Sequence, residues 1–144
     1  MPASVLIALG SNLGDRALHL RRALHAMREC MRIVRVSPIH ETAAVDAPSG
    51  SPDFLNMVAA GYTASSPEAL LDCLLAIETR LGRRRSIRNA PRTIDLDLIL
   101  YNSRMMRTPR LTLPHPRFLE REFVRAPLRE LNLRWIDPVS GTRL

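Results

Sequence analysis

Two aspartates separated by one residue are the side chains of this sequence whose type and spacing most directly suggest chemistry. Asp95 and Asp97 lie in residues 92–100, Arg-Thr-Ile-Asp-Leu-Asp-Leu-Ile-Leu, which otherwise have the pattern of a buried strand. Because successive strand side chains alternate between faces, both carboxylates are predicted to point to the same face. The leucines are predicted to point to the opposite face: Leu96, Leu98 and Leu100. Carboxylates on a central strand need a cation, and Mg²⁺ is typically bound by one or two carboxylates together with substrate phosphates.

Such a pair can also form a structural salt bridge with arginine, and the neighbouring residues decide between the two interpretations. All 21 basic residues of the chain are arginine, and the net charge is +7. Each arginine is a planar fork suited to phosphate or carboxylate, and without lysine there is no Walker-type phosphate lysine. Arginines are concentrated just before the aspartates, at Arg80, Arg83, Arg84, Arg85 and Arg88. A loop of such forks ahead of two carboxylates predicts chemistry on a nucleotide.

A basic run of this kind is more often a solvated face or a nucleic-acid patch. RNA-binding domains usually stack bases on aromatic side chains of a sheet. Aromatic residues make up 4% of this chain, and none lies in the predicted strands at residues 3–9 and 32–37. We therefore favour a loop that clamps a triphosphate and closes over it as a lid.

Length and composition predict one cytoplasmic domain spanning residues 1–144. The chain has 144 residues and is 46% hydrophobic, which is enough for one core. Cys30 and Cys73 lack metal-ligand spacing, so we expect small apolar core residues on helices, in a reducing compartment. The apolar stretch from Val5 to Leu9 has neither the length of a membrane span nor the basic leader of a signal peptide.

The order of predicted elements is strand, helix, strand, strand, helix, strand. Proline and glycine make residues 43–52 a loop, and Ser66-Pro67-Glu68 is a helix start signal for a helix that stops at Gly82. The order is that of a split βαβ, or ferredoxin-like, antiparallel sheet in the α+β class, followed by a C-terminal helix and hairpin. The predicted strands are 3–9, 32–37, 54–63 and the aspartate segment; the predicted helices are one capped by Asn12 or Asp15, one from Ser66 to Leu81 and one from Glu122 to Leu131; the hairpin is predicted around Pro138–Gly141. On the third strand, one face is predicted to carry Phe54, Asn56, Val58 and Tyr62.

His115 lies between two prolines that fix its backbone, in Leu-Pro-His-Pro. A lone histidine is more often structural than functional. Its proximity in sequence to Arg110, Thr112 and Arg121 favours a role in phosphate binding, because all three are potential phosphate donors.

Four segments together resemble the hydroxymethyldihydropterin pyrophosphokinases of folate biosynthesis. They are Pro-Arg-Thr-Ile-Asp-Leu-Asp ending at Asp97, Gly82–Arg85, Arg110–His115 and Leu9–Gly14. The resemblance covers nearly the whole chain. It implies transfer of pyrophosphate from ATP to 6-hydroxymethyl-7,8-dihydropterin with release of AMP, through two Mg²⁺ ions held by the two aspartates and an arginine-rich mobile loop.

The resemblance also implies roles for individual residues. The catalytic set would be Arg83, Arg92, Asp95 and Asp97, with both aspartates as metal ligands. ATP would be bound by Glu78, Arg83, Arg85, Leu98, Arg110, Thr112, His115 and Arg121. The pterin pocket would be built from Thr42, Ala44, Val45, Phe54, Asn56, Asp95 and Phe123. We expect a monomer that binds these small molecules and neither nucleic acid nor membrane.

The chain departs from the family pattern at three places. Asn89-Ala90 replaces the common Trp-Gly, Pro116 replaces a frequent tyrosine, and Thr42-Ala43 replaces Thr-Pro. None of these changes removes a metal ligand or a main arginine, so we expect an active enzyme with altered substrate affinity or lid motion. The alternatives are a nucleotidyltransferase, which would release pyrophosphate, and a non-catalytic RNA-binding module.

Overall fold

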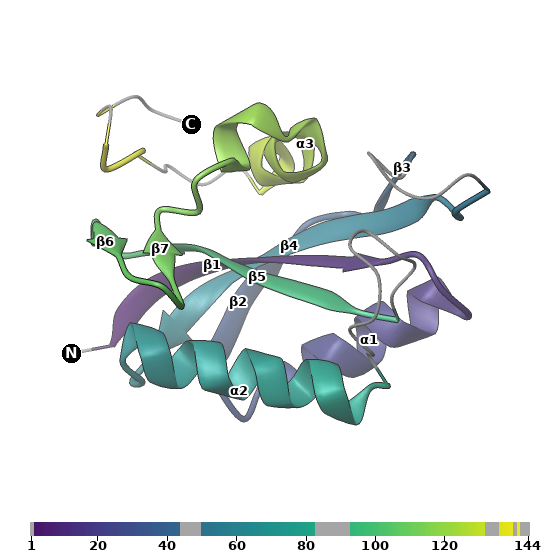
Figure 1. Cartoon of the computed structure of the whole chain (residues 1–144), viewed down its shortest axis with the longest axis horizontal. Helices are drawn as coiled ribbons and strands as arrows, with labels where there is room; N and C mark the ends of the chain where they lie inside the picture. The colour runs from purple at the N-terminus through teal and green to yellow at the C-terminus, as the bar shows by residue number, and fades with distance from the viewer. Residues whose placement is uncertain (1, 44–49, 83–92, 132–135, 140, 142–144) are drawn as a thin grey trace.

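The fold is an antiparallel sheet with helices on both faces (Figure 1). The computed structural model describes residues 2–43, 50–82, 93–131, 136–139 and 141. The sheet order is β2-β4-β1-β5, and β3 also pairs with β4. This order confirms the predicted ferredoxin-like arrangement. In chain order the elements are β1 (Ala3–Ser11), α1 (Arg16–Met27), β2 (Arg32–Val36), β3 (His40–Thr42), β4 (Phe54–Thr63), α2 (Pro67–Arg80), β5 (Asp95–Tyr101), β6 (Met106–Arg107), β7 (Thr112–Leu113), the 3-10 helix η1 (Phe118–Glu120) and α3 (Glu122–Glu130).

The helix boundaries follow from their capping residues. Asp15 caps α1, where its carboxylate accepts a hydrogen bond from the Leu18 amide, so the second of the two predicted caps is correct. Ser66 caps α2 in the same way, and Pro67 occupies the first helical position, where its missing amide proton is not needed. Helix α2 ends at Arg80, ahead of Gly82, as predicted.

The face of the sheet covered by α1 and α2 is a closed hydrophobic core. Helical spacing directs Leu20, Ala23 and Met27 of α1 onto the sheet, and α2 contributes Leu70, Leu74 and Ile77 in the same way. The strands supply Val5, Ile7, Leu9, Met57, Ala59, Leu96 and Leu98.

The opposite face is covered by α3, and here one prediction is wrong. Leu100 lies on the α3 face beside Val124 and Leu128, whereas Leu96 and Leu98 lie in the core under α1 and α2. The cause is a register shift between β1 and β5, where the partner of Leu6 is Leu100 but the partner of Ile7 is Leu98. The extra residue is a β-bulge, which reverses the alternation beyond it.

The short elements were not predicted from the sequence. Strand β3 has three residues and β6 and β7 have two each, which is too short for a periodic pattern. At the C-terminus Gly141 donates to the Asp137 carbonyl oxygen at 2.8 Å and closes a turn. Trp135 and the residues that would complete the predicted hairpin are outside the described part. None of the described helices is long and apolar enough to span a membrane.

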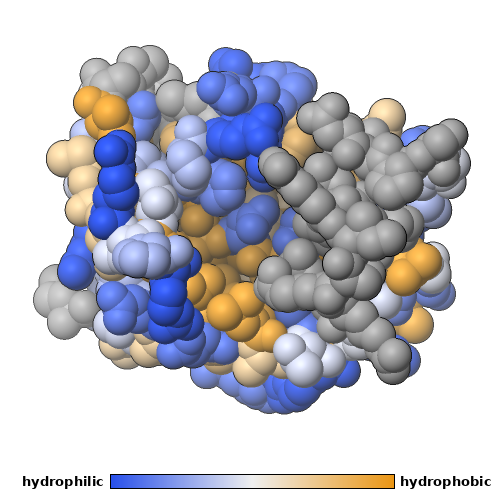
Figure 2. Space-filling view, viewed as in Figure 1, coloured by the Kyte–Doolittle hydropathy of each residue, from blue (hydrophilic) through white to orange (hydrophobic). Residues whose placement is uncertain are grey.

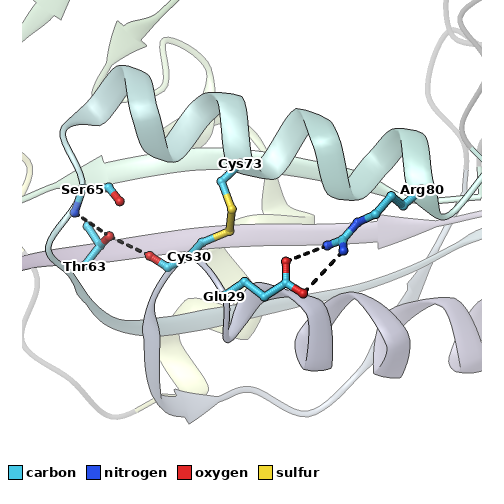
Figure 3. Close-up of a disulfide and its surroundings, with 6 residues drawn as sticks. All are labelled: Glu29, Cys30, Thr63, Ser65, Cys73 and Arg80. Atoms are coloured by element: carbon cyan, nitrogen blue, oxygen red, sulfur yellow. Dashed lines mark hydrogen bonds and ion pairs between the residues drawn. A yellow bond between two sulfur atoms is a disulfide. The ribbon is translucent and has the colours of Figure 1, made fainter.

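The two cysteines form a disulfide, which corrects the prediction of free thiols on helices (Figure 3). Cys30 lies in the turn after α1, and Cys73 lies in α2. Their Cα atoms are 6.2 Å apart although 43 residues separate them, because both helices pack on the same face of the sheet. Two exposed side chains, Glu29 and Arg80, join the same elements with an ion pair at 3.0 Å. The helix layer is therefore cross-linked both covalently and by charge.

Candidate active site

The two aspartates lie on the α3 face of β5, next to the central strand. Gly10 of β1 is paired with Asn56 of β4 on one side and with Asp95 of β5 on the other. In the next row Ala8 lies between Val58 and Asp97 in the same way. Directly paired residues of an antiparallel sheet point to the same face, so Asn56 and both aspartates share one surface. The predicted orientation of the carboxylates is confirmed.

Strand β3 completes one end of this surface. Thr42 is paired with Phe54, and the Asn56 side chain donates a hydrogen bond from Nδ2 to Thr42 Oγ1 at 2.6 Å. Asn56 is 5% exposed, so this bond fixes the amide in an otherwise buried position. Since Nδ2 is directed to Thr42, the amide oxygen faces the space over Gly10. This end offers one hydrogen-bond acceptor next to an aromatic ring.

Charged and aromatic groups from the start of α3 lie over the other end. Arg121 Nη1 is 4.0 Å from Asp97 Oδ2, and the Arg121 guanidinium lies 5.4 Å from the centre of the Phe123 ring. A cation over a ring face is held electrostatically as well as by packing. The two contacts place Arg121 between the carboxylates and α3.

His115 is attached to the same strand that carries the aspartates. Its amide donates to the Ile99 carbonyl oxygen at 2.9 Å, and its ring Nδ1 accepts from the Arg117 amide at 3.3 Å. Burial, and after it the positive charge of Arg121, lower the pKa of His115 to about 4 against the opposing effect of Asp95. The ring is therefore neutral at pH 7. With Nδ1 accepting, the proton is on Nε2, which can donate to an anion.

Three predicted nucleotide residues are placed away from this surface. Glu78 is buried in α2 on the helical side, where its Oε2 accepts from the Leu96 amide at 2.8 Å. The Leu98 side chain is in the core under the helices. Arg110 pairs with Asp72 of α2 on the exposed surface, and this hydrogen bond raises the pKa of Arg110 above its ordinary value. Thr112 lies in β7, next to β5.

Figure 2 draws in space-filling form the side of the molecule that is seen in Figure 1. Hydrophobic residues are visible in a hollow at the middle of this face, and hydrophilic residues gather above it over α3 (Figure 2).

Comparison with known proteins identifies the family. The family model described as 7,8-dihydro-6-hydroxymethylpterin-pyrophosphokinase (HPPK) matches residues 6–133. The chain belongs to the HPPK family.

Similar HPPK sequences occur alone and within longer proteins. A 2-amino-4-hydroxy-6-hydroxymethyldihydropteridine pyrophosphokinase of Bacillus subtilis is 43% identical over 127 residues, covering 87% of this chain and 75% of that protein. A mitochondrial folate synthesis bifunctional protein of Arabidopsis thaliana is 42% identical over 128 residues, covering 88% of this chain but 23% of that protein. The chain therefore spans about a quarter of the bifunctional relative.

Solved structures agree on the fold. A crystal structure of Plasmodium falciparum HPPK-DHPS has a TM-score of 0.71 at 14% identity, covering 91% of this chain and 41% of that one. At this identity the similarity concerns the fold alone, and the chain spans less than half of that protein.

Several residues expected from the HPPK resemblance lie outside the described residues. The arginines are Arg83, Arg85 and Arg92; the pterin-side residues are Ala44 and Val45; the lid positions are Asn89 and Ala90. Their predicted roles stay predictions.

A divalent cation suits the described carboxylates. No group of three or more metal-binding side chains occurs within the described ranges. Mg²⁺ is commonly bound by one or two carboxylates and completes its shell with water and phosphate oxygens, so two aspartates on one face are a sufficient protein contribution.

One residue of this surface was given no role from the sequence. Gly10 lies between Asn56 and Asp95, at the centre of the surface. The strand predicted at residues 3–9 stops before Gly10, whereas β1 continues to Ser11, so the sequence alone does not mark Gly10 as part of the strand.

Proposed function

We propose that this chain transfers the pyrophosphoryl group of ATP to the hydroxymethyl oxygen of 6-hydroxymethyl-7,8-dihydropterin and releases AMP, as a step of folate synthesis. The observation that carries the proposal is the position of Asp95 and Asp97 between two different surfaces. Asn56 and Phe54 lie at one end and suit a flat heterocycle. Arg121 lies at the other end and suits phosphate. The Bacillus subtilis relative carries the name of this activity.

In the proposed reaction the alcohol oxygen bonds to the β-phosphorus of ATP, and the hydroxyl proton is released to water. The bond from that phosphorus to the oxygen bridging the α- and β-phosphates breaks, and AMP leaves with the bridging oxygen. Little covalent work remains for the protein, so its contribution is positioning and charge stabilisation. Two Mg²⁺ ions held by Asp95 and Asp97 would supply charge neutralisation on the phosphates.

The phosphate end is supported by groups that are already oriented. Arg121 is held by Asp97 and by the Phe123 ring, so its fork needs little ordering to bind a phosphate. His115 would donate from Nε2 as a neutral ring. Arg110 would exchange Asp72 for a phosphate, and Thr112 would add a hydroxyl from β7. Arg83, Arg85 and Arg92 are proposed as the clamp of the loop.

The remaining nucleotide residues would act through the backbone of β5. Leu98 has its side chain in the core, so any contact with the nucleotide must use its main-chain groups. β5 is the last strand of the sheet, where main-chain groups on the outer side face β7 instead of another long strand. Glu78 holds the Leu96 amide and thereby the start of the strand that carries both aspartates.

At the pterin end, aromatic rings and one amide would bind the substrate. Phe54 offers a ring face at this end, and Phe123 would stack on the pterin from the α3 side, where its ring also contacts Arg121. Asn56 offers its amide oxygen to the N–H groups of the ring. Thr42 orients that amide. Ala44 and Val45 are proposed to complete the pocket.

The decisive experiment identifies the nucleotide product. The chain is incubated with ATP, Mg²⁺ and the pterin alcohol. The products are separated by ion-exchange chromatography and identified by ³¹P NMR. We expect AMP and pterin pyrophosphate in equal amounts, and no AMP without the pterin. ADP would indicate an ordinary kinase, pyrophosphate would indicate a nucleotidyltransferase, and AMP without pterin would indicate hydrolysis; each would overturn the proposal.

We further propose that residues 1–144 form one pyrophosphokinase domain that acts as a monomer on small molecules, without nucleic acid. Light scattering during size-exclusion chromatography measures the mass directly. A mass of twice the chain mass would refute the monomer.

A further inference from the structure

Gly10 occupies the centre of the candidate site, on the middle strand of the sheet. It is flanked by Asn56 on β4 and by Asp95 on β5, so it lies between the proposed pterin end and the carboxylate pair. Its neighbours on that face are side chains that end in the site. A side chain at this position would therefore project into the site, although Gly10 itself is assigned to neither the pterin nor the phosphates.

Backbone conformation does not explain why this residue is glycine. The described glycines with positive φ are Gly14, Gly50, Gly82 and Gly141, and Gly10 is not among them. In an ordinary strand conformation any residue is allowed, and glycine weakens a strand relative to alanine. The reason must lie in the space around it.

That space is closed to a methyl group by side chains of the proposed pterin pocket. A Cβ atom on Gly10 would lie 3.1 Å from Asn56 Oδ1, 3.3 Å from Phe54 Cδ1 and 3.6 Å from Phe54 Cε1. The first two separations are shorter than ordinary van der Waals contact. Asn56 cannot turn away freely, because Nδ2 is bonded to Thr42 at 2.6 Å. An added methyl would therefore displace the acceptor, the ring or both.

We propose that Gly10 sets the floor of the pterin pocket and so determines which ring the enzyme accepts. The inference rests on the proposed function. Without a side chain at this position, the Asn56 amide oxygen and the Phe54 ring stay open to a flat bicyclic ring. Gly10 is paired with Asp95 on β5, but the three heavy atoms nearest to an added Cβ belong to Asn56 and Phe54, so the main effect is expected on the pterin.

The test is Gly10→Ala, measured by two calorimetric titrations. The first adds Mg²⁺ with α,β-methylene-ATP, whose methylene bridge prevents transfer; the second adds 6-hydroxymethyl-7,8-dihydropterin to the nucleotide complex. We expect the nucleotide Kd to stay within about twofold and the pterin Kd to rise at least about tenfold, the effect of losing one good hydrogen bond. Tm should change by no more than about 3 °C, since alanine suits a strand better than glycine.

A matched substitution separates pocket shape from sheet packing. Gly61 lies in the same sheet, but its added Cβ would lie 1.9 Å from the Arg32 carbonyl oxygen, a main-chain atom. Gly61→Ala is therefore expected to lower Tm strongly by separating β2 from β4. Alanine should therefore weaken pterin binding at position 10 and destabilise the fold at position 61.

The proposal and the proposed function fail in different ways. If the wild-type nucleotide complex does not bind pterin, the proposed function is wrong. If the wild type binds pterin and Gly10→Ala binds it equally well, the role of Gly10 is wrong. The role is also wrong if folded Gly10→Ala loses nucleotide and pterin binding together. Should Gly10→Ala not fold, the pterin Kd of Phe54→Leu is compared with that of Gly10→Ala/Phe54→Leu, in which the ring contacts are gone. Equal values there would also overturn the role.

Discussion

The two faces of the sheet are built by the same strands and each buries an apolar cluster, but only the α3 face also carries the candidate site. Under α1 and α2, Leu9, Met57 and Leu96 form a closed apolar core. One position away on each strand, Gly10, Asn56 and Asp97 lie on the other face and belong to the candidate site. The helical face is tied by a disulfide and an ion pair, whereas the α3 face is covered by a single short helix.

Neighbouring residues of a strand point to opposite faces. Residues that stabilise the core under α1 and α2 therefore alternate with residues that could take part in chemistry on the α3 face. Residues on the helical face can be optimised for packing, because none of them needs to contact a substrate through its side chain. Residues on the α3 face keep half-exposed charges that would be costly in a core. Substitutions on the two faces should therefore change different measurable quantities.

The largest effect is expected on the α3 face. Asp97→Asn keeps the shape of the side chain but removes the charge that a cation requires, so turnover should fall at least about a thousandfold, or about 4 kcal/mol. Because the Asp97–Arg121 contact is partly exposed, the free energy of unfolding should change by less than about 1 kcal/mol. Initial rates and urea unfolding measure the two quantities. A folded Asp97→Asn variant with wild-type turnover would contradict the metal-binding role.

The helical face should give the reverse result when its cross-link is removed. The Cys30–Cys73 bond joins residues that are 43 positions apart in the sequence. Closing a loop of that length lowers the conformational entropy of the unfolded chain, which predicts about 4 kcal/mol of stabilisation. Dithiothreitol or Cys30→Ala should therefore lower Tm by about 10 °C while AMP formation at 20 °C is retained. Dithiothreitol should have no further effect on the Cys30→Ala variant. An unchanged Tm in reductant, with both thiols titrated by Ellman's reagent, would refute the stabilising role.

His115 provides a smaller, pH-dependent effect on the α3 face. Its pKa is about 4 when folded and 6.5 ordinarily, so between these values the unfolded chain binds the extra proton. Stability should consequently fall as pH drops from 6.5 to 4, by roughly 1–2 kcal/mol after allowance for solvent around a half-buried ring. His115→Gln should flatten this part of the stability profile in urea unfolding at pH 4.5 and 7. A steeper loss of stability with acid in that variant would be inconsistent with a neutral His115.

The smallest effect should come from the exposed ion pair on the helical face. Glu29→Gln removes the partner of Arg80, and exposed pairs contribute about 0.2–1 kcal/mol. Tm should fall by no more than about 3 °C, and less in 1 M NaCl because salt screens the pair. A larger loss at high salt would mean that packing, and not charge, joins these elements.

The long elements of this fold are predictable because each has a repeating pattern. The spacing of Leu70 and Leu74 indicates α2, and the aspartate strand alternates as predicted up to Leu98. The reversal at Leu100 was not predictable, since a bulge is fixed by pairing with β1 and leaves no mark in β5 itself. The disulfide was missed for a similar reason: Cys30 and Cys73 meet only after both helices pack.

The site shows the same limit. Asp95, Asp97, Asn56 and Arg121 were predicted from type, order and resemblance, and the structure brings them to one surface. Gly10 was not assigned, because its role depends on the distance to side chains of another strand. Neither sequence spacing nor composition contains that distance.

The hydrogen bond from the His115 amide to the Ile99 carbonyl oxygen has a consequence for sequence divergence. Both partners are main-chain groups, so exchanging either side chain leaves the bond in place, with proline at position 115 as the exception. The imidazole and the carboxylates are thus kept in register by the backbone of one strand. Substitutions of the side chains around this junction should therefore leave the spacing between the two halves of the site unchanged.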